Sequence, residues 1–599
     1  MQQRPSVEQS SYFNIAERMR RGTTRLLSSG ARPLGHGQTH EVFNQARAFV
    51  DVDLLASDKS LQRCIASADG LSPLSPAQVA RVAAFGKESG SARLMSLADD
   101  AEANKPTLRQ YDNAGRRIDV IDYHAAYHDL KRHTIEGGCT VSGHNDSGNP
   151  SAHVTRAALL LMANQMEPGH CCPVTMTSAA VPVLQTPNAH PVVRDFLDKV
   201  LAGRYDPRNC PISEKTGAQI GMSMTEKQGG SDVRANTTIA TPRGPGGAFT
   251  LRGHKWFTSA AMSDGFLTLA KVGNSADALP SCFLVPRWLP DGSRNAGFYI
   301  TRMKNKLGDR SNASSEVEYH DCSAFPVGEE GKGVRTILQM VQLTRLDCCI
   351  GAAGGMRRAL QVALNHTSTR SAFGAPLIQQ PLMEQLLAEL CAEAEAHTLS
   401  TMRLAQAYGN SMAAKEGSES ELFRAGVAVM KYYSTKAVPH FTYECLEALG
   451  GNGFTEDYPL ARLFRHSPLN SIWEGSGNVM ALDVLRASKG LPAVLAEAAL
   501  ARGQDASLDR FLAELTAAIK RLPAQTPADQ QRAARNLCDR LAVALQASLM
   551  VRFGQPEAAE LFLQCRVRPG EGARNYGTAT AATSSTHAVI SQHMPVFIS

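Results

Sequence analysis

The 599-residue sequence lacks any apolar run long enough to cross a membrane. One of its longer apolar stretches, residues 157–163, is far shorter than the roughly 20 residues that a membrane-spanning helix needs. We therefore expect no membrane association. The ordinary balance of 43% hydrophobic and 20% charged residues also argues against wholesale disorder and against a fibrous chain.

The 13 cysteines lack a regular spacing. Their number is odd, no CxxC pair occurs, and two pairs are direct neighbours, Cys171–Cys172 and Cys348–Cys349. A zinc knuckle or a disulfide framework has a different pattern. We predict buried, reduced thiols and no metal site.

Neither sign of charge is in large excess. Lys and Arg total 62 against 56 Asp and Glu, so the formal net charge is +6. This balance permits an anionic partner such as nucleic acid but does not require one.

The common catalytic motifs are missing as well. The sequence contains no Walker A loop, no GxSxG elbow and no HExxH helix. Residues 451–456 begin like a GxGxxG fingerprint but lack its last glycine and follow a helical pattern rather than a strand. These absences argue against most simple hydrolases, kinases and nicotinamide dehydrogenases.

The order of helical and strand patterns predicts an α+β fold rather than a doubly wound sheet. Helical periodicity appears at 77–85, 123–135 and 151–166, and longer helices are expected at 333–367, 379–408 and 419–449, with another from Asn478. Short alternating runs indicate strands in between. We expect a helical domain at 39–220, a β domain at 221–330, a helical bundle at 331–490, a further helical region at 491–567 and a flexible tail at 568–599.

Residues 1–38 form a basic leader with six arginines and two glutamates but no Asp or Lys. This composition is typical of a mitochondrial transit peptide, and equally of a disordered basic tail. The leader predicts the mitochondrial matrix in a eukaryote and the cytoplasm otherwise.

Three segments combine residues suited to ligand chemistry. Residues 222–232 combine hydroxyl side chains with a Gly-Gly pair. This combination would let the backbone approach a flat ring closely, but it is also typical of a plain hairpin turn. Residues 253–259 place aromatic side chains beside hydroxyls. They could stack on a ligand ring and bond its edge, or they could belong to an ordinary edge strand with cross-strand packing. In 471–478, Glu474 lies between Trp473 and a Gly-Ser-Gly turn, as a general base or as an exposed residue at a capped helix start.

Together these segments resemble the acyl-CoA dehydrogenase family, and most closely its AidB-like branch, which is linked to the adaptive response to DNA alkylation. The resemblance runs from about residue 39 to 567 and is most specific at 224–233, 254–257, 310–314, 376–383 and 471–478. It implies an N-terminal helical domain, a middle β-barrel, a C-terminal four-helix bundle and an extra C-terminal helical region. It further implies FAD as the cofactor, an acyl-CoA thioester as the substrate, electron-transfer flavoprotein or another electron acceptor, and a homotetramer.

The resemblance also implies roles for individual residues. Glu474 matches the family's catalytic base, which removes the α proton of the thioester while the β hydrogen leaves as hydride to flavin N5. Arg370 and Phe373 match the pair that contacts FAD from a neighbouring subunit, and Gly450 and Gly451 match a turn near the FAD diphosphate. The other matches to FAD-contacting positions are Met222, Met224, Thr225, Gly230, Ser231, Phe257, Thr258, Ser259, Ile472, Trp473, Gly475, Ser476 and Asn478.

The chain departs from most of the family at two places. Trp473 and Ser476 stand where Tyr and Thr are usual beside the base, and Pro381 stands where a FAD-contacting Gln is usual. The AidB-like branch shares both changes, so they question efficient acyl-CoA turnover rather than FAD binding.

The AidB-like branch is also implied to bind double-stranded DNA through its C-terminal region. The candidate residues here are Arg486, Lys520, Arg521, Arg532, Arg535 and Arg540. A balanced, solvated helix face explains the same residues. The sequence thus predicts an acyl-CoA dehydrogenase-like oxidoreductase, with a flavoprotein that protects DNA from alkylation as the alternative.

Overall fold

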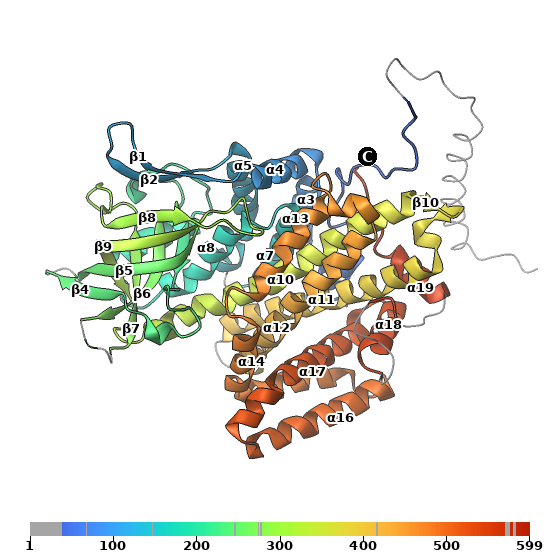
Figure 1. Cartoon of the computed structure of the whole chain (residues 1–599). Helices are drawn as coiled ribbons and strands as arrows, with labels where there is room; N and C mark the ends of the chain where they lie inside the picture. Colours follow the sequence, from blue (N-terminus) through green and yellow to red (C-terminus); the bar gives the residue numbers. More distant parts are fainter. Residues whose placement is uncertain are drawn as a thin grey trace, which may run out of the picture. The chain divides into compact units, whose positions relative to one another are not determined.

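The computed structural model describes residues 39–66, 69–146, 148–244, 247–273, 275, 278–414, 417–568, 576–578 and 583–598. Its contacts divide the chain into residues 1–46 and 47–599, and all helices and strands below belong to the second unit (Figure 1). The basic leader predicted at 1–38 lies outside the described residues.

The first part of this unit is mainly helical. The helix expected at 151–166 is confirmed as α7, and Ser75 caps α3 together with Gln78, whose side chain accepts a hydrogen bond from the Ser75 backbone. The elements are α2 (Lys59–Ala66), α3 (Pro76–Ser89), α4 (Ala92–Ala103), β1 (Thr107–Tyr111), β2 (Arg117–Asp122), α5 (Ala125–Thr134), η1 (Ile135–Cys139), α6 (Ser142–Asn145), α7 (Ser151–Met166), α8 (Cys171–Leu184), α9 (Pro191–Leu201) and η2 (Ile212–Glu214).

The β1–β2 hairpin corrects the expectation of a purely helical region. Asp112 accepts hydrogen bonds from the backbone of Ala114 and Arg116, and Gly115 has a φ of 77°, so a tight turn joins the strands. The turn residues were visible in the sequence, but the helical patterns on both sides concealed them.

The middle β-barrel is confirmed. The strands are β3 (Ile220–Ser223), β4 (Ile239–Arg243), β5 (Ala248–Ser259), β6 (Gly265–Val272), β7 (Pro280–Pro286), β8 (Phe298–Met303) and β9 (Ser314–Val327), with η3 (Val233–Ala235) between β3 and β4. The pairings β6–β4, β4–β5, β5–β9, β9–β7 and β7–β6 return to the starting strand, so the sheet closes on itself. Phe266, Phe283 and Phe298 lie in its separate apolar core.

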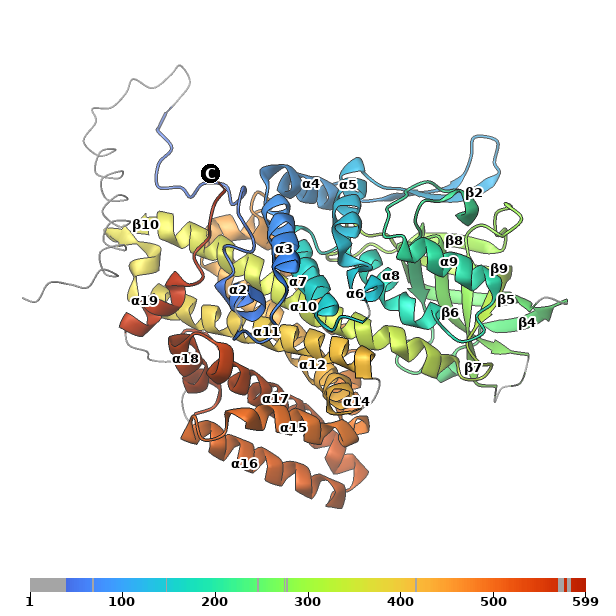
Figure 2. The ribbon, with the colours of Figure 1, turned by 180° about the vertical axis from the view of Figure 1, so that it is seen from behind.

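Long helices form the next region. The expected helices are confirmed as α10 (Gly333–Thr369), α11 (Pro381–Ala414), α12 (Ser418–Glu447) and α14 (Gly477–Arg486). The shorter elements are β10 (Ser371–Ala372), β11 (Ala375–Pro376), η4 (Leu377–Gln379), η5 (Gly450–Phe454), α13 (Pro459–His466), η6 (Ser467–Ser471) and η7 (Ser488–Gly490). Helices α10 and α11 pack against α7, α12 packs against α10 and α11, and the four helices share one core (Figure 2).

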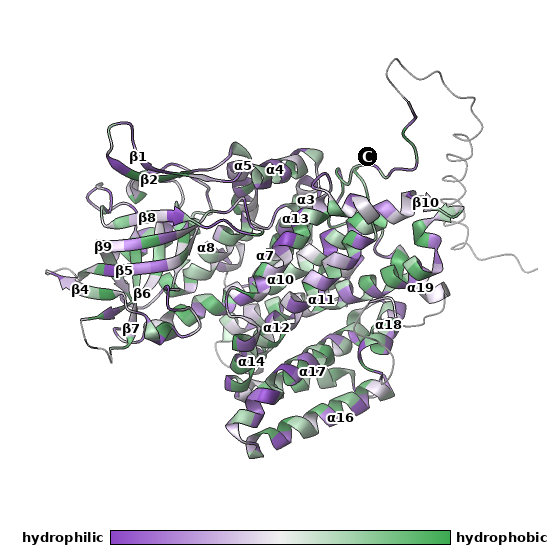
Figure 3. Ribbon diagram, viewed as in Figure 1, coloured by the Kyte–Doolittle hydropathy of each residue, from purple (hydrophilic) through white to green (hydrophobic). Residues whose placement is uncertain are grey.

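The region after residue 490 is also helical. It contains α15 (Leu491–Ala498), η8 (Ala499–Ala501), α16 (Ala506–Arg521), η9 (Leu522–Ala524), α17 (Pro527–Phe553) and α18 (Pro556–Arg566). Figure 3 shows hydrophobic and hydrophilic residues side by side along α16, which buries Leu508, Leu512 and Leu515 on one face.

The expectation of a flexible tail at 568–599 is corrected for the residues that the structure describes there. They include α19 (Thr583–Ser591), whose Val589 and Ile590 are buried. His593 is buried between Arg357 and Glu395, and the Ile598 amide donates to the Asp51 carbonyl. A few apolar and charged contacts hold this segment, although its composition is rich in small polar residues.

All 13 cysteines are free, and eleven of them are buried, as predicted. Among the described residues, no helix is long and apolar enough to span a membrane. The same part of the chain contains no cluster of three or more His, Cys, Asp or Glu side chains that could bind a metal ion.

Candidate active site

Glu474 lies in the short loop between η6 and α14. Its backbone has a φ of 57°, a left-handed conformation that is uncommon for any residue except glycine, and Gly475 follows with a φ of 103°. A Cβ at Gly475 would approach Met480 Cε to 2.6 Å, a contact that the flexible Met480 side chain could relieve, so the positive φ is what favours glycine here. Strained backbone of this kind concentrates at functional sites.

The Glu474 side chain is partly exposed and held at one oxygen. The Thr344 hydroxyl, on α10, lies 2.6 Å from Glu474 Oε2 and 3.0 Å from the Val341 carbonyl. Because Thr344 has one hydroxyl proton, it donates to the ionised carboxylate, and it becomes free to donate to Val341 when Glu474 is protonated. This arrangement accommodates both protonation states.

The carbonyl oxygens around Glu474 accept hydrogen bonds from two buried cations. Lys431, on α12, donates from Nζ to the carbonyls of Trp473, at 2.7 Å, and Gly475. Arg345 donates from Nε to the carbonyl of Glu474, at 3.0 Å. We call these contacts the carbonyl clamp; they fix three successive carbonyls of the loop.

Of the two cations in the carbonyl clamp, Arg345 has an acidic partner and Lys431 has none among the described residues. Arg345 pairs with Asp483 on α14 at 2.8 Å, and Asp483 also pairs with Arg424 at 2.9 Å. Among the residues that the structure describes, Lys431 Nζ donates only to these two carbonyls, and its side chain is fully buried. Burial therefore lowers the Lys431 pKa, while Cys348 and Glu474 oppose that shift.

Burial raises the pKa of the Glu474 carboxyl above its usual range. The Thr344 hydrogen bond and the positive charges of Arg345 and Lys431 act in the opposite direction. A carboxylate with a raised pKa is a better proton acceptor, so the loop presents a usable general base.

The predicted flavin wall lies on β3, β5 and the loop after β3. The Trp256 amide donates to the Thr225 carbonyl at 2.8 Å, which ties the two predicted segments together. Phe257 is exposed and Ser259 is half-buried. Thr258 is fully buried and its hydroxyl lies 2.6 Å from Ser223 Oγ, so that hydroxyl does not face a ligand. The side-chain role predicted for Thr258 is therefore unsupported, because strand alternation turns it inward.

A buried ion pair supports this wall. Lys255 Nζ lies 2.8 Å from Glu226 Oε1, and both side chains have no exposed surface. Glu226 also accepts hydrogen bonds from Thr237 and Thr238. Gly230 follows in the same loop, where a Cβ would come within 2.4 Å of Thr225 Oγ1. The loop at 225–231 is thus anchored at Glu226, with Thr225 half-buried and Gly230 and Ser231 exposed.

Cys172, on α8, links the flavin wall to Glu474. Burial raises the pKa of its thiol, and Asp309 and Glu474 act in the same direction, whereas Lys306 and a hydrogen bond with Ser259 lower it. Cys172 therefore lies close to both Ser259 and Glu474. In the sequence, Cys172 is recognisable only as part of an adjacent cysteine pair, because the approach of α8 to β5 depends on the tertiary fold.

The remaining predicted residues divide into two groups. Ile472, Ser476 and Asn478 are exposed beside Glu474, and Ser476 precedes α14 without capping it through its side chain; Met222 and Met224 are half-buried. Arg370, Phe373, Gly450 and Gly451 instead lie beyond the C-terminal ends of α10 and α12. Thr344 and Thr369 are 25 residues apart on α10, or about 38 Å at 1.5 Å per residue. One chain therefore keeps the two groups apart.

The second group and Phe454 follow the C-terminal ends of α10 and α12, and we call these five residues the distal patch: Arg370, Phe373, Gly450, Gly451 and Phe454. Phe373, at the β10–β11 turn, is 99% exposed and Phe454 is 86% exposed. A Cβ added to Gly450 or Gly451 would meet no atom within 4 Å. The distal patch has the room and the apolar side chains to receive another molecule.

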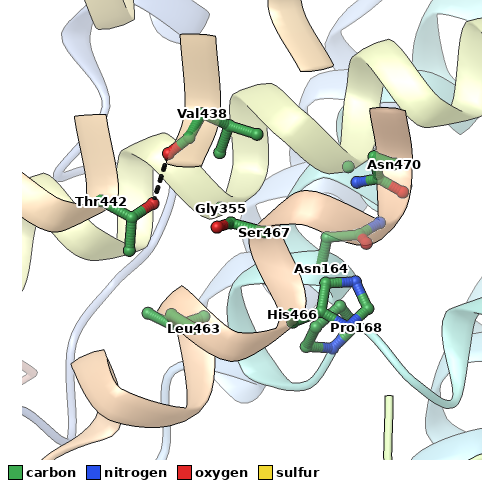
Figure 4. Close-up of a pocket in the computed structure, with 10 residues that line it drawn as sticks. Asn164, Pro168, Gly355, Val438, Thr442, Leu463, His466, Ser467 and Asn470 are labelled. Atoms are coloured by element: carbon green, nitrogen blue, oxygen red, sulfur yellow. Dashed lines mark hydrogen bonds between the residues drawn. The ribbon is translucent and has the colours of Figure 1, made fainter. Parts of the chain in front are cut away.

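A small pocket with a mixed polar and apolar lining lies where α10 passes α12 (Figure 4). Gly351 and Gly355 of α10 lie beside Val438 and Thr442 of α12, whereas Thr344 and Lys431 meet at Glu474. The two helices therefore run in the same direction. Asn470, which also lines the pocket, accepts a hydrogen bond from Trp473 Nε1 at 2.9 Å. Trp473 is thus held between this pocket and the base.

The candidate DNA-binding residues do not form one free basic face. Arg532 pairs with Asp529 at 2.6 Å, Arg540 pairs with Glu514 at 3.3 Å, and Arg535 donates to the Tyr432 hydroxyl at 3.1 Å. Arg486, Lys520 and Arg521 are exposed on two other helices, α14 and α16. The positive charge at 532–540 is largely used within the protein.

Comparison with known families assigns three regions. Residues 44–207 match the family described as "Adaptive response protein AidB N-terminal domain". Residues 221–322 match the middle domain of acyl-CoA dehydrogenases, and residues 331–489 match their C-terminal domain. These matches cover the helical region, the barrel and the bundle.

Individual proteins agree with this assignment. The chain is 39% identical to the Escherichia coli (strain K12) protein named "Putative acyl-CoA dehydrogenase AidB", over 90% of this chain and 96% of the relative. It is 31% identical to "Acyl-CoA dehydrogenase family member 11" of Caenorhabditis elegans, over 67% of this chain and 65% of the relative.

Solved structures share the fold. The Caenorhabditis elegans protein ACDH-11, solved in complex with C11-CoA, has a TM-score of 0.78 at 26% identity, covering 94% of this chain and 98% of that one. An acyl-CoA dehydrogenase from Bacillus anthracis, complexed with FAD, has a TM-score of 0.64 at 15% identity, covering 87% of both chains. This chain belongs to the acyl-CoA dehydrogenase family, in its AidB-like branch.

Proposed function

We propose that this protein is an FAD-dependent acyl-CoA dehydrogenase in which Glu474 removes a proton from Cα of the acyl thioester. The observation that carries the proposal is the state of the Glu474 side chain. It is partly exposed, Thr344 holds one of its oxygens at 2.6 Å, and burial raises its pKa. These are the properties of an accessible general base.

The residues present fit FAD. Exposed Phe257 and half-buried Met222 and Met224 offer an apolar wall, and exposed Ser476 and Asn478 stand where the amide groups at the start of α14 favour an anion. Residues 222–231 and 257–259 would hold the ring system. The distal patch of a second copy would hold the dinucleotide end. When bound, FAD supplies the hydride acceptor.

The chain's own residues perform the proton transfer. Thr344 and the carbonyl clamp orient the ionised Glu474, which accepts the Cα proton of the acyl-CoA. The β hydrogen leaves with its electron pair to the cofactor, so a Cα–Cβ double bond remains. The protonated Glu474 then donates to Thr344, whose own proton turns to the Val341 carbonyl.

The substrate class is an acyl-CoA thioester, as in the C11-CoA complex of the Caenorhabditis elegans relative. The indole of Trp473 is fixed beside the base by Asn470 and narrows the adjoining space. We therefore propose a short or branched acyl chain. Electron-transfer flavoprotein or another acceptor would reoxidise the cofactor.

The distal patch supports assembly of several copies, for which we propose a homotetramer. Phe373 and Phe454 are almost fully exposed in one chain, which is unfavourable in water. A second copy would cover them and would bring the FAD-contacting Arg370 and Phe373 to a base site that they cannot reach within their own chain.

The test is to mix the FAD-loaded protein anaerobically with a panel of acyl-CoAs that differ in length and branching. We expect one class to bleach the visible flavin absorption. A yellow protein that no acyl-CoA bleaches would contradict the dehydrogenase assignment, and a protein that takes up no FAD would contradict the cofactor assignment.

DNA binding is not favoured by a specific contact. Arg532 and Arg540 are already paired with acidic residues, and only three of the six candidate residues lie on α17. Binding to double-stranded DNA stays a prediction of the family resemblance, to be measured by its salt dependence.

A further inference from the structure

We propose that Lys431 is a positioning residue for Glu474: its ammonium group holds the base loop in its left-handed conformation and supplies the positive charge that favours the ionised carboxylate. The proposal rests on the proposed function of Glu474 as the base. It assigns a role to a buried cation on α12 that the proton transfer itself does not use.

Geometry is the first argument. Lys431 Nζ donates to the carbonyls on both sides of Glu474, those of Trp473 and Gly475, from a helix 42 residues away in sequence. With Glu474 at a φ of 57° and Gly475 at 103°, the loop has an unfavourable backbone conformation. Two hydrogen bonds from one charged group compensate for it and leave the Glu474 side chain directed at Thr344.

The position of the charge is the second argument. Arg345 is balanced by Asp483, but no ion pair is found for Lys431 among the described residues. The ionised Glu474 carboxylate therefore favours the positive charge of this fully buried lysine, as do the thiols of Cys348 and Cys349. Proton transfer to Glu474 and the charge state of Lys431 are consequently linked.

Among the described residues, two cations and two thiols interact electrostatically with Glu474. Arg345 comes from α10 and Lys431 from α12, and both lower the Glu474 pKa. Cys348 of α10 and Cys172 of α8 lie close enough for the Glu474 charge to raise the pKa of their thiols. Since both thiols stay neutral at ordinary pH, Arg345 and Lys431 are the charges that set the carboxylate's ionisation.

Two variants separate the two roles of Lys431. K431M removes both the hydrogen-bond donors and the charge, and K431Q keeps amide donors but removes the charge. The matched control is K215M. Lys215 is also buried, and its Nζ also donates to two carbonyls, those of Asp206 at 2.7 Å and Arg208 at 2.6 Å, but it pairs with Asp264 rather than with the base loop.

The first measurement is the pH profile of flavin reduction by a reactive acyl-CoA. We expect K431M to be slower by about 10- to 100-fold near neutral pH, because a misplaced base reacts poorly. The acid limb should move to higher pH in K431M and K431Q, and should stay in place in K215M. A K431M profile that overlies that of the parent protein would overturn the proposal.

The second measurement does not need turnover. Amide hydrogen exchange of residues 472–476 should be faster in K431M than in the parent or K215M, with K431Q close to the parent. If no acyl-CoA reduces the flavin of the parent protein but the expected exchange pattern is found, the proposed function fails and the positioning role stands. Unchanged exchange in K431M would overturn the positioning role. If K431M does not fold, K431Q decides the charge argument by its acid limb alone.

Discussion

Two regions along α10, one around Thr344 and one beyond its C-terminal end, differ in how their residues are held. At the Thr344 end, a left-handed glutamate is held by a hydroxyl, a lysine and an arginine within one chain. At the other end, the distal patch leaves Phe373 99% exposed and Gly450 without neighbours. Under the proposed function, the acid–base chemistry is complete in one chain, whereas the cofactor site needs a second copy.

Glu474→Gln should have the largest effect, because it removes the base and leaves the surrounding contacts in place. Flavin reduction by acyl-CoA should fall by about 10³-fold or more, while FAD stays bound. Glu447→Gln, at an exposed position near the end of α12, is the control and should react normally. Unchanged reduction in Glu474→Gln would show that the base lies elsewhere.

Breaking the distal patch should have the next largest effect. Phe373→Ser combined with Phe454→Ser should shift the protein to smaller assemblies and lower the amount of FAD retained per chain by more than about tenfold, because the covering copy contributes apolar contacts. Sedimentation velocity and the visible absorption measure both outcomes.

Leu500→Ser is a matched control for the distal patch, since Leu500 is 58% exposed in η8. If the double variant remains assembled and fully yellow, the distal patch does not complete the cofactor site.

A smaller effect is expected from changing the hydrogen bond between Thr344 and Glu474, which alters the pH dependence of flavin reduction. The rate of flavin reduction should fall as pH is lowered through the raised pKa of Glu474, because only the carboxylate accepts the proton. Thr344→Val removes a hydrogen bond that lowers this pKa, so the acid limb should move upward by about one pH unit, or about tenfold in rate on that limb. A downward shift would contradict this account.

The smallest effect is expected at the C-terminal region, which belongs to neither end. Replacing Arg532, Arg535 and Arg540 together by Ala should change the affinity for double-stranded DNA by less than about threefold, because two of these charges are already paired. A gel shift across salt concentrations measures it. Loss of binding with a clearly reduced salt slope would show that these arginines contact phosphates.

Sequence patterns predicted the middle β domain from its short alternating runs and the long helices from their regular periodicity, as at 151–166, whereas the closed barrel was implied only by the family resemblance. They missed the β1–β2 hairpin and α19, where five or six residues and a few buried contacts decide the structure. Glu474 and its neighbours could be predicted from the family resemblance. The parts played by Thr344, Lys431 and Cys172 could not, because these residues lie 130, 43 and 302 positions from Glu474 and meet it only through packing.

The continuous helix α10 connects the region around Thr344 to the C-terminal end from which Arg370 and Phe373 follow. The 37 residues of α10 contain no proline, and at 1.5 Å per residue the helix is about 55 Å long. A tilt of about 5° around its centre, near Gly351, would move Thr344, which is about 10 Å from that centre, by about 1 Å. Since a displacement of that size at a catalytic group can cost about 100-fold in rate, docking of the proposed second copy beyond the C-terminal end of α10 would be mechanically coupled to the alignment of Glu474.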